Sequence, residues 1–229
     1  MAIERFLNTV VRLLFPPKCI FCGKVLNINV DLEICADCLK EVSFIDDMDI
    51  RSGKFWSQKN WYDGVICVYQ YNSVVKRSII RYKFYNRSSY YRTFGKILAD
   101  RIRKTVKIGE FDLIISVPLH KNRERKRGYN QSLLISKVLS KELGLRESSR
   151  LLVRLKDTGS QSLLNRKGRL ANLKGAFKVC DEDAVRNKNI LLVDDVMTTG
   201  STIDECSKVL KKAGAARVVA AVIATGRKY

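Results

Sequence analysis

The sequence of 229 residues lacks the features that mark several large classes of protein. It has only three prolines and 13 glycines, which excludes collagen-like chains and chains made mainly of linkers. No uninterrupted apolar run approaches the roughly 18 residues that a membrane span needs, so we expect no integral membrane protein. Glycine-lysine followed by serine or threonine occurs nowhere, and neither does G-x-G-x-x-G, so the two common nucleotide-binding motifs are absent.

Acidic residues are scarce in the middle of the chain. Residues 1–50 carry 5 basic and 8 acidic side chains, residues 51–175 carry 29 and 8, and residues 176–229 carry 9 and 7. The middle segment, with a net charge of +21, therefore accounts for the formal net charge of +20. Two interpretations stay open: a solvated surface that keeps the protein soluble, or a surface that binds a polyanion. With 46% hydrophobic residues the chain can build a packed core, which argues against intrinsic disorder.

Cysteine occurs in an odd number, seven, which disfavours a fully paired disulfide framework. Four of the seven form two Cys-x-x-Cys pairs, Cys19 with Cys22 and Cys35 with Cys38, separated by twelve residues. Two such pairs supply four thiolate ligands, which is how proteins hold structural zinc. A redox dithiol and an iron–sulfur cluster are the alternatives, but a redox motif needs only one pair. We predict a closed, structural zinc site, with Gly23 providing a left-handed turn after the first pair.

The other three cysteines, Cys67, Cys180 and Cys206, are isolated, and we predict that they are buried thiols. Free thiols together with thiolate ligands indicate a reducing cytoplasm.

Apolar residues recur at helical spacing over residues 3–15, before Pro16 and Pro17 end the pattern. We expect a short amphipathic helix that packs on a neighbouring domain. A helix that rests on a membrane surface is the alternative, and it would make membrane association peripheral at most. A signal peptide is disfavoured because polar residues interrupt the apolar stretch and no cleavage site follows.

Beyond residue 60 apolar strands alternate with amphipathic helices. Predicted strands span residues 65–71, 112–117, 190–193 and 217–225, and predicted helices span residues 73–84, 89–106, 130–143 and 201–213. Strands of continuous Val, Ile and Leu between helices indicate a parallel sheet that is covered on both faces. Ligands of such α/β folds bind beyond the carboxyl ends of the strands, so the loops that follow the strands are the candidate sites.

The segment after the strand at 190–193 reads Asp194-Asp195-Val196-Met197-Thr198-Thr199-Gly200-Ser201-Thr202. It places two carboxylates before four hydroxyl residues and a glycine, where we expect a helix to begin. Backbone N–H groups at a helix N-terminus attract an anion, and the hydroxyls add donors. The carboxylates would repel a phosphate and should face sugar hydroxyls or a divalent cation. The pattern predicts a ribose 5-phosphate site; a capped helix behind an acidic turn is the alternative without function.

This segment resembles the phosphoribosyl pyrophosphate (PRPP) loop of type I phosphoribosyltransferases. Other segments narrow the resemblance to the ComF family of competence-associated proteins, over nearly the whole chain. They are the two cysteine pairs, Ser116-Val117-Pro118-Leu119-His120 with Arg123, Arg127-Gly128-Tyr129-Asn130-Gln131, and Gln161-Ser162-Leu163 with Arg166 and Asn172. The resemblance implies an N-terminal helix and zinc module over residues 1–50. It also implies a type I phosphoribosyltransferase-like α/β domain over residues 51–229, with its PRPP loop at 190–202.

The resemblance also implies roles for individual residues. Asp194 and Asp195 would hold the ribose hydroxyls and form the catalytic pair. The 5-phosphate would be held by Thr198, Thr199, Gly200, Ser201 and Thr202. Pyrophosphate, bridged by magnesium, would lie at the loop after the strand at 112–117, where the matching residues are Leu119, His120 and Arg123.

Residues 121–127 read Lys-Asn-Arg-Glu-Arg-Lys-Arg, with six charged side chains among seven residues. As a basic loop beyond a buried strand, this run could neutralise the leaving pyrophosphate or bind nucleic-acid phosphates. A plain solvated loop is the third interpretation. His120, the sole histidine, precedes the run, and we do not expect it to act as a base.

Aromatic residues alternate with cations between residues 69 and 94. The aromatic residues are Tyr69, Tyr71, Tyr82, Phe84, Tyr85, Tyr90, Tyr91 and Phe94, and the cations among them are Lys76, Arg77, Arg81, Lys83, Arg87 and Arg92. Proteins bind single-stranded nucleic acid by stacking its bases on aromatic rings and pairing its phosphates with cations. We expect Tyr82 and Phe94 to be core residues instead. The residues assigned to nucleic acid are Lys83, Arg87, Arg123, Arg125, Lys126 and Arg127.

Two functions are consistent with these observations. The first is a PRPP-binding protein of natural competence and DNA uptake, with single-stranded DNA as its polyanion and proteins of the competence machinery as partners. The second is a magnesium-dependent phosphoribosyltransferase of nucleotide salvage that transfers ribose 5-phosphate to a nucleobase and has no role with DNA. Residues 176–229, which contain the PRPP loop, are nearly neutral, so the basic excess favours a second and larger anion.

Overall fold

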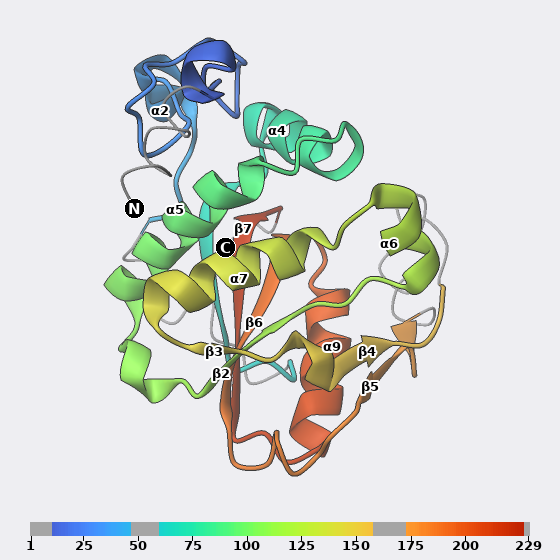
Figure 1. Cartoon of the computed structure of the whole chain (residues 1–229). Coiled ribbons are helices and arrows are strands. Elements are labelled where there is room, and N and C mark those ends of the chain that lie inside the picture. The colour runs from blue at the N-terminus through green and yellow to red at the C-terminus, as the bar shows by residue number, and fades with distance from the viewer. Residues whose placement is uncertain (1–10, 47–59, 158–172, 227–229) are drawn as a thin grey trace.

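The computed structural model describes residues 11–46, 60–157 and 173–226. At its centre lies a five-stranded sheet in which every neighbouring pair of strands is parallel (Figure 1). Across the sheet the order is β1 (Gly64–Gln70), β7 (Arg217–Thr225), β6 (Asn189–Met197), β2 (Leu113–Ser116) and β3 (Arg146–Glu147). The fold class is therefore the predicted parallel α/β sheet, and its strands are formed by the continuous apolar runs.

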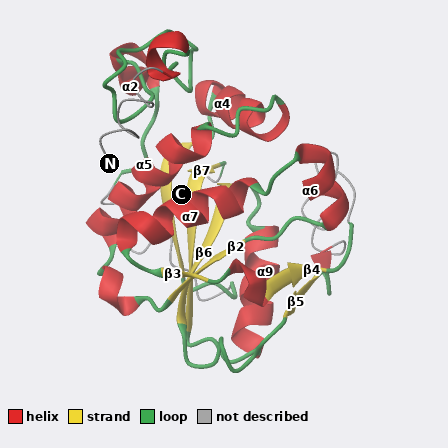
Figure 2. Ribbon diagram, in the orientation of Figure 1, coloured by secondary structure: helices red, strands yellow, loops and turns green. Residues whose placement is uncertain are grey.

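Helices cover both faces of this sheet (Figure 2). The helices α5 (Tyr90–Thr105) and α7 (Gln131–Leu143) lie on one face, and α9 (Ser201–Lys212) lies on the other. Close packing of α5 on α7 depends on Gly95, because a Cβ atom there would lie 2.6 Å from the side chain of Val138.

Alternate residues along each strand belong to two separate cores. On β6, Leu191 and Val193 pack with α5 and α7, whereas Ile190 and Leu192 pack with α9. Side chains of a strand point to opposite faces in turn, so one apolar run supplies both cores.

The chain reverses its direction of travel across the sheet between β2 and β6. From β2 it continues outward to β3, and from β6 it continues the other way to β7. Such a switch point opens a crevice between the loops that follow the two strands. The loops that we singled out in the sequence, one after β2 and one after β6, are thereby brought side by side at the carboxyl edge.

Two boundaries at this edge differ from the predictions. The strand predicted at 190–193 runs on to Met197, because Asp194, Val196 and Met197 keep their pairing with β7. Asp194 and Asp195 therefore lie in a strand and not in a loop. The predicted basic loop at 121–127 is a helix, α6 (Lys121–Arg127), which His120 caps.

Short elements escaped prediction because two or three residues carry no usable periodicity. They are β3, the antiparallel pair β4 (Leu152–Arg154) and β5 (Phe177–Val179), and the 3-10 turns at Ile108–Glu110 and Ser149–Leu151.

The N-terminal module lies against β1, α5 and the helix α4 (Ser73–Phe84) (Figure 1). It contains α2 (Ala36–Glu41), and residues 11–14 are helical, while the rest of the helix predicted over 3–15 lies outside the described residues. Ser78 Oγ donates to the carbonyl of Ile20 at 2.6 Å, and Arg81 donates to the same carbonyl at 3.0 Å. Across residues 11–46, 60–157 and 173–226, no helix combines the length and the apolar character that crossing a membrane requires.

Candidate functional site

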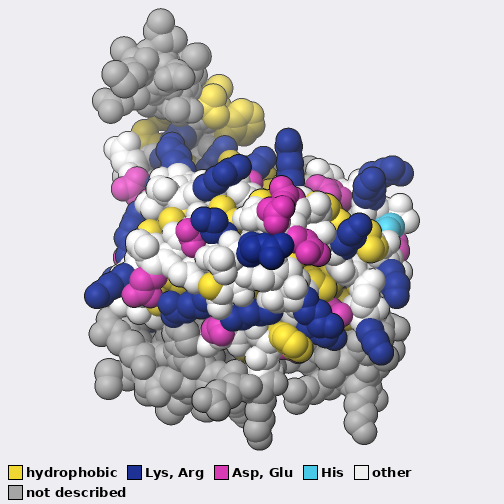
Figure 3. Space-filling model, turned by 90° about the horizontal axis from the view of Figure 1, so that it is seen from below, with side chains coloured by type: hydrophobic (Ala, Val, Ile, Leu, Met, Phe, Trp, Pro, Cys, Tyr) yellow, Lys and Arg dark blue, Asp and Glu magenta, His cyan; other side chains and the backbone are white. Residues whose placement is uncertain are grey.

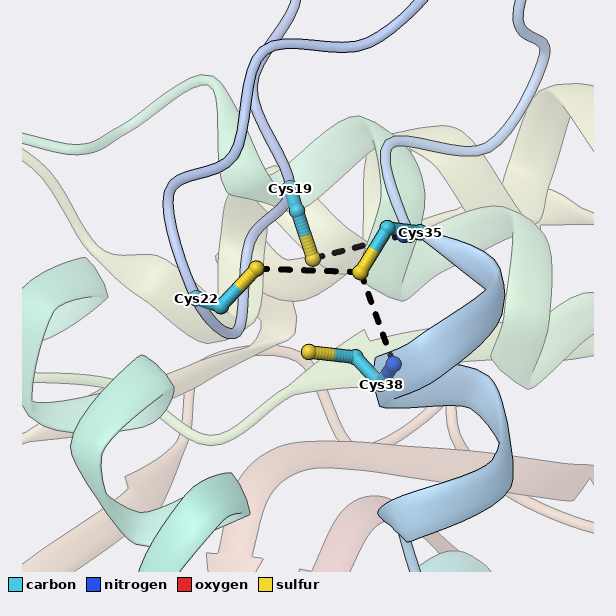
Figure 4. Close-up of side chains that lie close together, drawn as sticks. All are labelled: Cys19, Cys22, Cys35 and Cys38. Carbon is cyan, nitrogen blue, oxygen red and sulfur yellow. Dashed lines mark hydrogen bonds between the residues drawn. The ribbon is translucent and has the colours of Figure 1, made fainter.

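The four cysteines of the two Cys-x-x-Cys pairs converge on one point (Figure 4). Their sulfur atoms all lie within 4.8 Å of one another, and Sγ of Cys22 is 3.7 Å from Sγ of Cys35. Zinc–sulfur bonds of about 2.3 Å at tetrahedral angles place sulfur atoms roughly 3.8 Å apart. Gly23 has φ +83°, so the predicted left-handed turn is present. The cluster has the ligands and the dimensions of a structural zinc site.

Backbone N–H groups also point at these sulfur atoms, as expected for thiolates. The amide of Cys35 donates to Sγ of Cys19, and the amide of Cys38 donates to Sγ of Cys35, both at 3.4 Å. Cys35 is at the same time the N-cap of α2, so the metal knuckle and the helix stabilise each other.

The two carboxylates at the end of β6 have different surroundings. Asp195 is buried, with its side chain 3% exposed, and its Oδ1 lies 2.8 Å from Nζ of Lys83 in the last turn of α4. Oδ2 of Asp195 is buried and has no hydrogen-bond partner among the described residues. Asp194 is half-buried, and its Oδ1 accepts from Ser132 Oγ at 2.8 Å and from the amide of Asp195 at 2.9 Å.

These surroundings shift the proton equilibrium of Asp194. Burial raises the pKa of its carboxyl from 3.8 to about 7, and the negative charge of Asp195 adds to the rise. Lys83 and the hydroxyl of Ser132 act in the opposite direction but do not cancel it. Proton affinity of this kind is typical of functional sites, although buried structural pairs also produce it.

The segment after β6 forms a small hollow at the start of α9. The hollow is lined by Asp194 and by residues 196–203. Gly200 adopts φ +79° as the N-cap of α9, which lets the chain turn sharply into the helix. Oγ1 of Thr199 and Oγ of Ser201 lie 2.9 Å apart, and Thr198 is exposed. Four hydroxyl residues therefore line one small space at the N-terminus of α9, where an anion site is expected.

The segment after β2 forms the other side of the crevice. His120 Nδ1 accepts from the amide of Asn122, so the histidine caps α6, and Leu119 beside it is half-buried. Nε of Arg123 lies 3.3 Å from Asp157 Oδ1. Asn130 caps α7 and donates to the carbonyl of Val117 at 3.2 Å, which ties the start of α7 to the end of β2.

A basic cleft of about 870 Å³ opens between the end of α4 and α6. It is lined by Lys83, Phe84, Asn86, Asn122, Arg123, Arg125, Lys126, Arg127, Gly128 and Asp157. Five cations from two segments of the chain thus meet around a single carboxylate. The guanidinium of Arg127 lies 5.0 Å from the ring centre of Phe84 and donates to Gln131 Oε1. This set of residues is called the basic cleft below.

The structure brings together five of the six residues that we assigned to nucleic acid. Arg87 is the exception, because it lines a separate hollow of about 460 Å³ together with Arg77, Arg81 and Tyr85. On the face where the strands begin, by contrast, Lys and Arg side chains are interspersed with Asp and Glu (Figure 3).

Four of the eight aromatic residues between 69 and 94 are buried and not available for stacking. Tyr82 and Phe94 are core residues, as predicted, but Tyr69 and Tyr90 are buried as well. Tyr82, Tyr90 and Phe94 lie on the packed faces of α4 and α5, and Tyr69 lies in the buried strand β1. Phe84 and Tyr85, at the end of α4, are 67% and 66% exposed.

The isolated cysteines divide differently from the prediction. Cys67 and Cys206 are buried, whereas Cys180 is exposed just after β5. The motif residues Gln161, Ser162, Leu163, Arg166 and Asn172 lie outside the described residues.

Ser132 and the Lys83–Asp195 pair were not foreseen as parts of one site. Ser132 follows the quoted Asn130-Gln131, so its nearness to a candidate motif was the available signal. The ion pair joins residues 112 positions apart, and no local pattern reveals it.

Comparison with known proteins agrees with this geometry. Residues 93–229 match the phosphoribosyl transferase domain family, and residues 10–48 match the double zinc ribbon domain family. Competence protein F of Haemophilus influenzae is 32% identical over 211 residues, which cover 86% of this chain and 92% of that protein. The DNA utilization protein YhgH of Escherichia coli O6:H1 is 36% identical, covering 67% of this chain and 68% of its own. Competence protein ComFC of Bacillus subtilis is 26% identical, covering 88% and 74%.

Proposed function

The chain belongs to the ComF family of competence-associated proteins, and on that premise we propose that it acts in natural competence and DNA uptake. In this proposal it binds PRPP at the carboxyl edge of its sheet and single-stranded DNA in the basic cleft. Similar proteins are named for competence and for DNA utilization, which supports the biological role. We also propose that residues 1–50 form the zinc module and residues 51–229 the phosphoribosyltransferase-like domain.

The observation that carries the PRPP site is the convergence of the Asp194–Asp195 pair with the anion-binding turn at Gly200. Carboxylates accept hydrogen bonds from sugar hydroxyls, and the turn into α9 offers amides and hydroxyls to a phosphate. The 5-phosphate would be held by Thr198, Thr199, Gly200, Ser201 and Thr202. A ribose 5-phosphate presents these two chemistries at its two ends.

The pyrophosphate of PRPP would lie across the crevice, near Leu119, His120 and Arg123. Magnesium, when bound with PRPP, would supply further positive charge to the pyrophosphate. Departure of pyrophosphate leaves a sugar with oxocarbenium character, and the carboxylates of Asp194 and Asp195 would stabilise that positive charge. The chain itself needs to orient the ribose and to neutralise the leaving group.

Calorimetric titration with PRPP and magnesium chloride tests this site. The wild-type chain should bind one PRPP, and the Asp194→Asn, Asp195→Ala double variant should lose binding, because the ribose hydroxyls lose both charged acceptors. Asp100→Asn, which removes an exposed carboxylate on α5, serves as the matched control and should bind PRPP like the wild type. Unchanged binding in the double variant would remove the basis for the PRPP site.

Single-stranded DNA is the anion that suits the basic cleft. The cleft holds five cations and the exposed ring of Phe84, which provides a face for base stacking. A strand of DNA offers repeated phosphates at the spacing of its backbone, whereas one sugar phosphate cannot use all of these cations. The cleft also adjoins the PRPP site through Lys83, so both ligands would act on one edge of the molecule.

A catalytically active phosphoribosyltransferase is the second candidate, favoured by the domain family of residues 93–229. It would transfer ribose 5-phosphate from PRPP to a nucleobase. Release of pyrophosphate from PRPP, assayed with a panel of free bases and then with an oligonucleotide, separates the candidates. Turnover with a free base makes the chain a transferase; DNA binding without turnover makes it a binding protein.

The site of action that we propose is the cytoplasm, with proteins of the competence machinery as partners and at most a peripheral contact with the membrane. The four-thiolate cluster and the unpaired cysteines support a reducing compartment.

A further inference from the structure

Lys83 belongs to both of the sites described above. It stands in the last turn of α4, where it lines the basic cleft. Its Nζ also lies 2.8 Å from Oδ1 of Asp195, a residue of the PRPP site. The Lys83 side chain is 23% exposed, whereas that of Asp195 is 3% exposed, so the ammonium lies where the buried site opens into the cleft.

The buried end of this ion pair limits what Lys83 can do. Oδ2 of Asp195 already lacks a hydrogen-bond partner among the described residues, and Lys83 supplies the contact at Oδ1. A buried carboxylate that loses its cation is strongly destabilised unless another donor takes the place of that cation. Lys83 is therefore held at Asp195 as long as the PRPP site contains no ligand.

A ribose changes this balance because its hydroxyl groups can donate to Asp195 in place of the ammonium. Lysine has a long and flexible stem, so Nζ can turn into the cleft without movement of α4. There it would join Arg123 and Arg127 as one more cation for a phosphate. A phosphate in the cleft would likewise draw Lys83 from Asp195 and leave the carboxylate to the ribose.

We propose that Lys83 couples the two ligands, so that PRPP and single-stranded DNA each strengthen the binding of the other. The coupling rests on the proposed function, since it needs both ligands. The affinity of the basic cleft for DNA would then report whether PRPP is bound, because a chain with bound PRPP binds DNA more tightly than a chain without it. Coupling between two ligands is reciprocal, so the same factor must appear in both affinities.

The coupling factor is the dissociation constant for DNA without PRPP divided by that with PRPP. Fluorescence anisotropy of a labelled oligothymidylate measures both constants. Each protein is titrated with and without saturating PRPP, with magnesium chloride and ionic strength equal in both arms. We expect PRPP to tighten DNA binding of the wild type at least about fivefold, the lower end of usual coupling. Lys83→Met, which keeps the apolar stem, should bring the factor to one. Lys126→Met should weaken DNA binding equally in both arms and keep the wild-type factor.

A second variant tests the same role of Lys83 by an expected gain in DNA affinity. Asp195→Asn removes the charge that holds Lys83, so DNA should bind more tightly without PRPP. In the Lys83→Met background the same change should have no such effect. If Lys83→Met does not fold, Asp195→Asn alone still decides, because unchanged or weaker DNA binding of this variant without PRPP would overturn the proposal.

Failure of the coupling differs from failure of the proposed function. If both ligands bind the wild type and the factor is one or below one, Lys83 does not couple them in the proposed sense. A wild-type factor that survives in Lys83→Met has the same consequence. If PRPP does not bind at all, the proposed PRPP site is wrong and the coupling falls with it.

Discussion

Asp194 and Asp195 are neighbours in the chain with the same side chain, yet they differ in what surrounds them. Oδ1 of Asp195 contacts Nζ of Lys83 on α4, whereas Oδ1 of Asp194 accepts a hydrogen bond from Oγ of Ser132 on α7. Asp195 has a cation at contact distance, whereas Asp194 has a hydroxyl and an amide. Burial and the neighbouring Asp195 raise the pKa of the Asp194 carboxyl to about 7, so Asp194 can exchange its proton near neutral pH.

The raised pKa of Asp194 predicts how stability depends on pH. An acid whose pKa rises on folding binds its proton more tightly in the folded chain, so its contribution to stability falls as pH rises from about 4 to about 7. Asp194→Asn removes this contribution. The free energy of unfolding of the variant minus that of the wild type should therefore increase as pH rises. Urea unfolding at a series of pH values between 5 and 8 measures this difference.

The difference between variant and wild type isolates Asp194 from the titration of the cysteine cluster, which both proteins share. Asp100→Asn, the exposed counterpart on α5, should show a flat difference across the same range. A flat difference for Asp194→Asn as well would mean that Asp194 titrates as an ordinary carboxyl.

Among the elements, α4 connects the zinc module to the carboxyl edge of the sheet. Ser78 and Arg81 donate to the carbonyls of Ile20 and Phe21 in the zinc module. Two residues after Arg81, Lys83 contacts Asp195. The metal knuckle thus helps to place the helix that forms one wall of the basic cleft.

Loss of zinc should therefore loosen α4. Without the metal the four cysteines no longer fix the knuckle, so the carbonyls of Ile20 and Phe21 no longer hold Ser78 and Arg81 in place. Hydrogen exchange measured by mass spectrometry should rise in α4 after chelation, or in Cys22→Ser, while α9 stays protected. Cys180→Ser, which changes an exposed cysteine outside the cluster, should leave α4 as it is. Unchanged exchange in α4 after zinc loss would contradict the connection.

Most elements could be predicted because their apolar residues repeat with a clear period. The helix at 73–84 and the strand at 217–225 have the predicted bounds, and Gly144 and Gly214 follow their helices with positive φ. Residues 121–127 have no apolar face in the sequence, so their pattern predicts a loop, although the cap at His120 and Gly128 at φ +85° enclose the short helix α6. Pairing with β7 extends β6 through the two aspartates, and sequence periodicity does not contain that pairing.

The separate motifs of the candidate site could be predicted from the sequence, but their arrangement in space could not. The carboxylate pair, the turn at Gly200 and the basic run at 121–127 each have a local signature. Lys83 connects the carboxylate pair to the basic run at 121–127. Its position depends on where α4 ends in space, which follows from packing across the whole chain.

For the whole molecule, the uneven charge of the sequence now has a location. The basic excess of residues 51–175 supplies all five cations of the cleft at the carboxyl edge. The face at which the strands begin carries both signs of charge (Figure 3). Cations gathered in a cleft beside the proposed PRPP site favour two anionic ligands on one edge and not a single shared one.

Two separate sites allow PRPP and single-stranded DNA to be bound to one chain at the same time, and this can be measured. PRPP with magnesium is titrated into wild-type protein that is already saturated with a labelled oligothymidylate, while calorimetry follows PRPP and anisotropy follows the DNA. We expect one PRPP to bind per chain and the oligonucleotide to stay bound throughout. Release of the oligonucleotide in proportion to the PRPP bound would show that the two anions compete for a single site, and would contradict this expectation.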